Sequence, residues 1–377
     1  MMLLMAGACS SSDDEGGQKG GVSKKPTKLA IYVYSPGQAA TRLSEGTRGD
    51  EGNVDVSNAA EGEIKSLKLW IYEHESGDYV GYLDTEDVAS LNSGKGITYQ
   101  IPVSDEFAAN KPDVDVYVMA NVKPANCGVG TLDMNTTRTE LMSKAKIVES
   151  KFGLSPLTTE VPTQGLPMAG KLTTQPVVGE APALRVGSMS AVSTVQLTRA
   201  VSKLRFVFSK TKNQPKVTIT SIKMNAEMIP NEVYLFKKPE SVTISYNTDP
   251  VELLSNDIDD IAETADPTKY IYFDQEAQAY EDLINEAASK QPNPEVTVRG
   301  PIYLRESDKQ LEGTISYTIA GVAKEPVKFQ MQQAGDFSRN HTWIVYAYYA
   351  GSGNLQVQSL YVKDWSGKEM SHSFYNW

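Results

Sequence analysis

The stretch LTRAVSKLRFVF, residues Leu197 to Phe208, decides the fold class of this chain. It lies in a longer segment, 193–209, that is dense in β-branched and aromatic residues, and residues 217–224 continue the same composition. Residues of these types favour strands. We therefore expect the middle of the chain to form β-sheet.

Toward the C-terminus, short segments of strand composition alternate with turn residues. The expected strands are residues 302–306, 313–319, 327–332, 343–349 and 355–365. The last two flank a turn at Gly351–Gly353. Residues 250–264 and 274–290 are expected to be helical or irregular, with 281–289 as the better helix. Many short strands with few helices are typical of β-sandwiches.

Toward the N-terminus, two segments alternate apolar and polar residues with the period of two that indicates a strand. These segments are KSLKLWIY at 65–72 and DVDVYVMA at 113–120. A short helix is expected within 136–148, and residues 154–187 are rich in proline and glycine. This organisation predicts a mainly β chain of two β-sandwich domains with a boundary near residue 195.

The segment LAIYVY, residues 29–34, predicts an isolated first strand with Leu29, Ile31 and Val33 on one face. Residues 35–62 contain almost no large apolar side chain, which predicts an open loop. Loops of that length are uncommon inside compact domains and are usually functional or disordered. The sequence therefore predicts one strand that a long loop separates from the next.

Two arginines, Arg42 and Arg48, lie in this loop. Exposed loops of small polar residues are favoured sites of proteolytic cleavage. Arg48 also begins an RGD tripeptide, which could bind an integrin. So short a motif arises readily by chance, so we assign it no role.

The N-terminus, MMLLMAGACSSSDD, has an apolar run that ends in small residues and Cys9. This pattern is typical of a bacterial lipoprotein signal, in which the cysteine is diacylated and residues 1–8 are removed. Only eight residues precede Cys9 and none is basic, so we expect a start codon further upstream. Residues 10–28 predict a flexible tether. The alternative is an ordinary hydrophobic N-terminus with an incidental cysteine.

Charge and composition exclude several classes of protein. The chain has 377 residues and a formal net charge of -11, which makes nucleic acid an unfavourable partner. Its two cysteines are Cys9 and Cys127, so we expect no internal disulfide and no thiolate metal cluster. No apolar run approaches the roughly 18 residues that span a membrane.

No motif predicts catalysis. The three histidines, His74, His341 and His372, lack partners at metal-ligand spacing. The sequence contains no GxSxG, phosphate-loop or HExxH motif. Carboxylate pairs such as Asp259 and Asp260 are typical of an acidic surface, although paired acids can serve glycoside hydrolysis. We therefore expect neither an enzyme nor a cofactor, and an incidental or structural role for Cys127.

Five ordered landmarks resemble the fimbrillin family, the subunits of type V pili in Bacteroidota. They are LPMAG (Leu166–Gly170), LTRAVSKL (Leu197–Leu204), PIYLRE (Pro301–Glu306), RNHTW (Arg339–Trp343) and VKDW (Val362–Trp365). With Cys9 they extend the resemblance from residue 9 to residue 365. The acidic run at 10–15 is similar to the surface-export tag of lipoproteins from these bacteria. The resemblance implies two tandem β-sandwich domains, of transthyretin-like Greek-key type, with a few short helices.

The resemblance also implies a mechanism of assembly. The first strand, with Leu29, Ile31 and Val33, would be a placeholder that completes a sheet during transport. An arginine-specific protease would cut behind it, at Arg48 or else at Arg42. Another subunit's extended segment would then fill the groove by donor-strand exchange. The alternative is that residues 29–34 form a permanent first strand with a flexible loop behind it.

In this family the donor strand comes from the C-terminus. The candidate segment is 355–377, with the apolar residues Leu355, Val357, Leu360 and Val362. Few residues of its tail alternate cleanly. A short or inert tail suits a tip or anchor subunit better than a stalk subunit, and the choice stays open.

The predicted divisions are a signal remnant at 1–8, a lipidated tether at 9–28, a removable strand and cleavage loop at 29–48, and sandwich domains at 49–195 and 196–377. The expected function is that of a structural subunit of adhesive surface fimbriae, tethered to outer-membrane lipid through Cys9. Its partners would be other pilin subunits, the protease and a host receptor or glycan. The alternative is a monomeric surface lipoprotein that binds glycan or host protein, including a tip subunit that does not polymerise.

Overall fold

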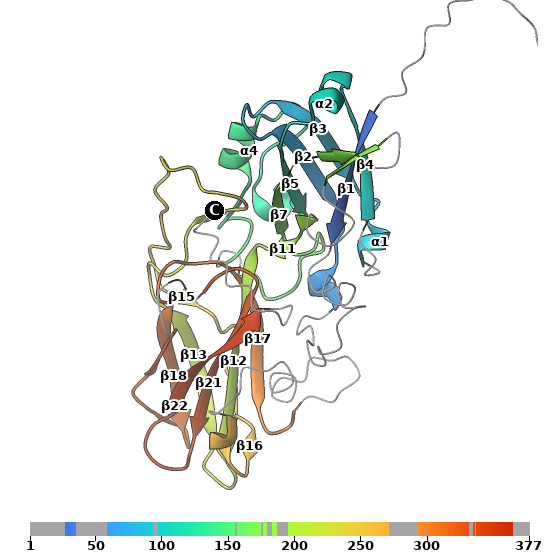
Figure 1. Cartoon of the computed structure of the whole chain (residues 1–377). Helices are drawn as coiled ribbons and strands as arrows, with labels where there is room; N and C mark the ends of the chain where they lie inside the picture. The colour runs from blue at the N-terminus through green and yellow to red at the C-terminus, as the bar shows by residue number, and fades with distance from the viewer. Residues whose placement is uncertain are drawn as a thin grey trace, which may run out of the picture.

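A computed structural model describes residues 27–34, 59–92, 97–154, 157–174, 176–178, 183–186, 195–270, 293–331, 335 and 337–364. The structure is mainly β, and its sheets form two β-sandwiches, with the N-terminal one above the C-terminal one in Figure 1. The predicted fold class is therefore confirmed. The helices are short: η2 (Ala59–Gly62), α1 (Ala89–Asn92), α2 (Asp105–Asn110), α3 (Pro124–Cys127), α4 (Arg138–Lys144) and η3 (Pro267–Tyr270). No helix in these residues is long and apolar enough to cross a membrane.

The first sheet of the N-terminal sandwich is built around its first strand, and we call it the β1 sheet. Its described strands are β1 (Thr27–Tyr34), β4 (Ile97–Val103), β8 (Pro176–Val178), β9 (Ala183–Val186) and β10 (Val195–Gln196). Strand β1 pairs antiparallel with β4 on one side and parallel with β9 and β10 on the other. It is therefore an interior strand.

The second sheet, the β5 sheet, is antiparallel throughout. Its order is β11 (Thr198–Arg199), β7 (Met168–Thr174), β5 (Val114–Ala120), β2 (Leu67–Glu73) and β3 (Tyr79–Thr85). Residues such as Leu69 and Val116 pack toward the β1 sheet, as the alternation predicts. The intervening Trp70 and Tyr117 are buried as well, because other parts of the chain cover the opposite face. The sheet is thus buried on both sides.

The stretch 197–208 passes from the N-terminal sandwich, where it forms β11, into the C-terminal sandwich, which begins with β12 (Val201–Thr211). Its first sheet contains β12, β16 (Glu263–Thr264), β17 (Thr297–Arg305), β21 (His341–Tyr349) and β22 (Gln356–Asp364). Its second contains β13 (Val217–Met224), β15 (Val251–Glu252), β18 (Glu312–Ile319), β19 (Val322–Ala323) and β20 (Val327–Gln330). Between them, the Phe206 and Phe329 rings meet edge to face with centroids 5.3 Å apart. This geometry adds to the gain from burying the two rings.

The two sandwiches share a continuous core. One apolar cluster joins Trp70 and Tyr117 of the N-terminal sandwich to Val201, Tyr303 and Ile344 of the C-terminal sandwich. A two-stranded sheet of β6 (Lys146–Val148) and β14 (Glu232–Tyr234) also lies outside the four larger sheets. Because this shared cluster is extensive and apolar, it holds the two sandwiches together as one body.

Helix α4 accounts for the helix expected within 136–148. Thr137 caps its N-terminus, and the side chain of Glu140 bonds back to the Thr137 backbone, which completes a capping box. The helix ends at Lys144, and residues 146–148 form β6 instead. The better helix candidate, 281–289, lies outside the described residues.

Gly170, the last residue of the LPMAG landmark, lies where β7 passes the backbone of β10. A β-carbon at this position would lie 2.5 Å from the Gln196 carbonyl oxygen and 2.9 Å from Val195 Cγ1. Only glycine allows this approach without displacement of the backbone. The landmark glycine therefore permits contact between the two sheets of the N-terminal sandwich.

Candidate functional site

Strand β1 is the first candidate site, and it lies inside its sheet beside β4 (Figure 1). Leu29, Ile31 and Val33 are at most 1% exposed and belong to the core of the N-terminal sandwich. The antiparallel pairing with β4 runs continuously from Thr27 to Val33. The sequence correctly predicted the strand and its apolar face. Removal of the strand stays a prediction.

The interior position of β1 means that its loss would leave backbone groups of its neighbours unpaired. Its backbone is paired along both edges, and its apolar side chains fill one layer of the sandwich. Without β1, strands β4 and β9 would each present a row of unpaired N–H and C=O groups. An extended segment with apolar residues at alternate positions has the geometry to satisfy those groups.

The second candidate site is a buried polar junction between the sandwiches, centred on Glu61. This residue lies in η2, the first described element after the loop, and has no solvent exposure. Lys203 Nζ lies 3.0 and 3.2 Å from its carboxylate oxygens, and the Tyr303 hydroxyl donates to Oε1 at 2.6 Å. Burial raises the pKa of Glu61, but the Lys203 charge and the Tyr303 hydrogen bond outweigh it, so the pKa lies below its ordinary value.

Three of the sequence landmarks meet at this junction. Arg199 and Lys203 come from LTRAVSKL, and Arg199 Nε donates to the Glu61 carbonyl oxygen at 2.9 Å. Tyr303, which donates to Glu61, belongs to PIYLRE, and Arg199 Nη1 donates to Oδ1 of Asn340 in RNHTW at 3.4 Å. The landmarks therefore correspond to a network of buried charges that fixes the two sandwiches together.

Sequence reasoning missed Glu61, because a single acid after a polar loop produces no pattern. The residues that bind Glu61 did carry a signal in the sequence. Arg199 and Lys203 stand inside an apolar strand segment, and a charged side chain in such a position is buried only with a partner.

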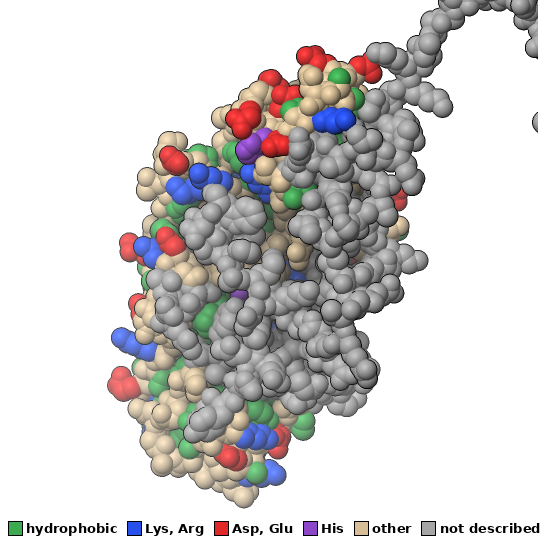
Figure 2. Space-filling model, viewed as in Figure 1, with side chains coloured by type: hydrophobic (Ala, Val, Ile, Leu, Met, Phe, Trp, Pro, Cys, Tyr) green, Lys and Arg blue, Asp and Glu red, His purple; other side chains and the backbone are tan. Residues whose placement is uncertain are grey.

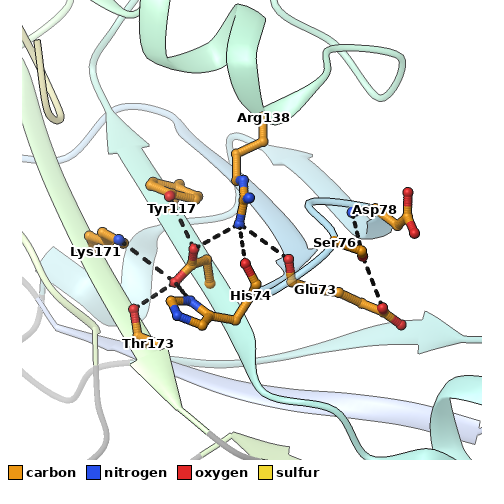
Figure 3. Close-up of polar contacts among 9 residues, drawn as sticks. Glu73, His74, Ser76, Asp78, Tyr117, Arg138, Lys171 and Thr173 are labelled. Carbon is orange, nitrogen blue, oxygen red and sulfur yellow. Dashed lines mark hydrogen bonds and ion pairs between the residues drawn. The ribbon is translucent and has the colours of Figure 1, made fainter. Parts of the chain in front are cut away.

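A third polar cluster surrounds Asp115 on β5, whose side chain is only 4% exposed. Figure 3 shows Arg138 reaching down from α4 toward this carboxylate, with Lys171 and Thr173 approaching from β7. The distances to the carboxylate oxygens are 2.6 Å from Thr173 Oγ1, 3.1 Å from His74 Nδ1, 3.3 Å from Arg138 Nη1 and 3.7 Å from Lys171 Nζ.

The surroundings of Asp115 keep it ionised. Burial raises the pKa of Asp115, but the hydrogen bonds from Thr173 and His74 and the charge of Lys171 outweigh it, so the pKa lies below its usual value. Because each oxygen already has cationic or hydroxyl partners, the cluster anchors α4 to the β5 sheet. Within the described ranges, no group of histidines, cysteines and acids could hold a metal ion.

Cys127 has the environment of a structural thiol. Its side chain is buried, and burial raises the pKa of the thiol to about 12. Such a thiol is almost entirely protonated at neutral pH and is a poor nucleophile.

The predicted donor strand lies in β22, at the edge of its own sheet. Leu355, just before the strand, is buried, and its N–H donates to the Tyr317 hydroxyl at 3.1 Å. Val357 packs against the C-terminal core, and the backbones of Leu360 and Val362 pair with β21. The lipidation residue Cys9, the arginines Arg42 and Arg48 and residues 365–377 lie outside the described residues.

The chain thus consists of two stacked β-sandwiches joined by a buried network of landmark residues. The model of the major fimbrial subunit protein (FimA) family matches residues 27–255, and the chain belongs to this family. The predicted family relationship is therefore confirmed. Membership makes the chain a fimbrial or adhesion protein of the cell surface.

Solved structures have a similar fold at low sequence identity. A structure described as a cell adhesion protein from Parabacteroides distasonis is 15% identical, with 92% of this chain and 99% of that chain covered and a TM-score of 0.53. One from Bacteroides eggerthii is 12% identical, with 90% and 96% covered and a TM-score of 0.47. The tip fimbrial protein Mfa3 from Porphyromonas gingivalis is 12% identical, with 90% and 100% covered and a TM-score of 0.46. No curated protein matches the sequence significantly.

Proposed function

We propose that this chain is a structural subunit of surface fimbriae that is exported as a lipoprotein through Cys9, cleaved after Arg48 or Arg42, and assembled by donor-strand exchange. Lipidation would tether the precursor to the outer membrane, and the assembled fibre would support adhesion. The observation that carries the proposal is the position of β1, which is an interior strand that precedes the arginine-containing loop.

The energetics of β1 agree with a strand that is held firmly before cleavage and can be replaced after it. Three fully buried side chains and pairing on both edges hold the strand in place. Once the loop is cut, β1 is joined to the sandwich by non-covalent contacts alone. An incoming strand can then recover the same hydrogen bonds and fill the same apolar positions.

The Glu61 junction supports the same sequence of events. Cleavage after Arg48 makes Gly49 the new N-terminus, only twelve positions before Glu61. Lys203, Arg199 and Tyr303 hold Glu61 through contacts that do not involve β1. The sandwich junction can therefore stay intact while the placeholder leaves.

The test uses the lipid-free chain and an arginine-specific protease. We expect cleavage in the loop, loss of the fragment that contains residues 29–34, and formation of SDS-resistant oligomers. Single Arg42→Ala and Arg48→Ala variants identify the cleaved bond by intact mass, and the double variant should stay uncut and monomeric. Retention of the cut fragment on a monomeric chain would contradict removal of the strand.

A second candidate function has its own supporting observation. Because Leu355 and Val357 pack in their own C-terminal sandwich, a donor strand formed from β22 would first have to leave its sheet. A tip subunit or monomeric adhesin needs no such release. This candidate would bind a glycan or host protein at the cell surface.

A reversible disulfide between β21 and β22 distinguishes the two candidate functions. Ala347 and Val357 are partners across β21 and β22, so the variant Ala347→Cys/Val357→Cys can tie the strands by a disulfide. For a stalk subunit whose donor is β22, the cleaved variant should polymerise when reduced and stay monomeric when oxidised. A tip subunit should stay monomeric in both states, and polymerisation of the oxidised form would exclude β22 as the donor.

A further inference from the structure

A pocket of about 590 Å³ lies on the face of the β5 sheet opposite to β1. Helix α4, strands β5 and β7, and the loop that follows β14 form its walls. In Figure 2, Lys and Arg side chains gather on the left of the molecule, close to α4. The volume falls within the roughly 300–1,000 Å³ typical of sites for small ligands.

The charge of the pocket is opposite to that of the chain. Its lining includes the four cations Arg138, Lys171, Lys237 and Lys238 and a single acid, Glu240. The chain as a whole has a formal net charge of -11. Cations gathered in a concave site on an acidic protein create a local positive potential. The pocket is therefore suited to a small anion, whereas a long polyanion would be repelled by the surrounding surface.

Not all of these cations are equally able to meet a ligand. Arg138 is already bound to the Asp115 carboxylate and to the His74 carbonyl oxygen (Figure 3). Lys238 Nζ donates to the Val242 carbonyl oxygen at 2.6 Å. Both therefore act mainly as fixed positive charges.

Lys171 and Lys237 have weaker attachments. Lys171 Nζ is 3.7 Å from Asp115 Oδ1 and lies 5.2 Å from the centre of the Tyr117 ring. Lys237 Nζ is 3.7 Å from Glu240, and both of these side chains are mostly exposed, so the pair is weak. A ligand anion can draw these two ammonium groups toward itself at low cost.

The remaining lining is apolar. The Tyr117 and Phe236 rings meet edge to face with centroids 5.0 Å apart, and Met142 and Leu235 lie beside them. Tyr117 and Leu235 are buried, whereas Phe236 and Met142 are partly exposed. The pocket therefore offers an apolar surface to one side of a ligand and positive charge to another.

We propose that this pocket binds an anionic saccharide. Lys171 and Lys237 would hold the acidic group, and the apolar C–H face of a sugar ring would pack against Phe236 and Met142. An acidic peptide would bind more readily along a strand edge or in a helix groove than in a discrete pocket of this size. The site names a ligand class for the glycan-binding candidate and goes beyond the proposed assembly of fimbriae. It does not depend on strand exchange, because β1 lies on the other face of the β5 sheet.

The experiment titrates the uncleaved, lipid-free chain by calorimetry with 3′-sialyllactose and with a hyaluronan tetrasaccharide. Lactose and chitotetraose are the neutral counterparts, and tetraglutamate is the acidic peptide. We expect at least one acidic saccharide to bind, each neutral counterpart to bind about tenfold more weakly or not at all, and tetraglutamate not to compete. Binding should weaken with added salt.

Matched variants assign the binding to the pocket. Lys171→Gln/Lys237→Gln should weaken the acidic saccharide by about tenfold or more while the melting temperature changes little. Lys324→Gln/Lys328→Gln removes the same charge from exposed positions of the C-terminal sandwich and should leave the affinity unchanged. Failure of both acidic saccharides to bind, equal binding of the neutral sugars or of tetraglutamate, or equal loss in the control variant would each overturn the proposal.

Discussion

Lys203 Nζ lies 3.0 Å from Glu61 Oε2, and neither side chain is exposed to solvent. The two residues are 142 positions apart in the sequence. The pair joins the element that follows the arginine-containing loop to the first long strand of the C-terminal sandwich. It therefore couples η2, the first described element after the loop, to the C-terminal sandwich.

Removal of one partner of this pair should be costly. Lys203→Met leaves the Glu61 carboxylate buried without its cation, which should lower the free energy of unfolding by about 3–5 kcal/mol. Urea denaturation followed by tryptophan fluorescence measures the change. Lys216→Met breaks the exposed pair with Asp259 and should cost less than about 1 kcal/mol. Equal effects of the two variants would argue against a special role for the junction.

Truncation in β1 should loosen the strand. Ile31→Ala removes a side chain that is 1% exposed, and we expect the intact chain to lose about 2–5 kcal/mol of stability. After cleavage of the loop, mass spectrometry should show faster loss of the β1 fragment than in the wild type. Val322→Ala, at a position that is 60% exposed, provides the matched control. Unchanged release from Ile31→Ala would mean that β1 is not held by its buried face.

The Asp115 cluster predicts a pH dependence. Because the folded pKa of Asp115 lies below its unfolded value, its stabilising contribution is present above about pH 4 and is lost as the pH falls through the folded pKa. Asp115→Asn should cost about 1–3 kcal/mol at pH 7, and the gap from the wild type should narrow at pH 3. Urea midpoints at the two pH values measure it. A constant gap would show that ionisation of Asp115 does not contribute.

The close approach at Gly170 predicts intolerance to a single methyl group. Gly170→Ala places a β-carbon 2.5 Å from the Gln196 carbonyl oxygen and should cost about 1–3 kcal/mol. Gly130→Ala is the control, because no heavy atom lies within 4 Å of its β-carbon position. We expect that variant to stay within about 0.5 kcal/mol of the wild type. Thermal unfolding of both distinguishes a steric effect from a general effect of losing glycine.

Strands with strong apolar periodicity could be predicted from the sequence. The segments 65–72 and 113–120 became β2 and β5, because alternation reports directly on one buried face. The segment 197–208, predicted from its β-branched and aromatic composition, became β11 and β12. The strands β7, β8 and β9 could not be predicted, because proline and glycine residues interrupt the strand pattern between residues 154 and 187. At Gly170 the glycine serves contact between sheets, which is invisible without the neighbouring strand.

The candidate sites also differ in how far the sequence predicts them. The apolar face of β1 could be predicted because its residues are contiguous in sequence. The Glu61 junction and the pocket could not, because each assembles residues that lie far apart in the sequence. Local patterns carry no information on such distant partners. The cleavage, lipidation and donor-strand assignments stay predictions.

The apolar core shared by the two sandwiches has a mechanical consequence. Bending the subunit where the two sandwiches meet would expose large side chains such as Trp70 and Tyr303 to water. The loss of this apolar burial would cost a large free energy. A filament of such units would therefore flex at the joints between subunits rather than within them. Under flow, each subunit would behave as a stiff link in a chain, and the joints would determine the reach and curvature of the filament.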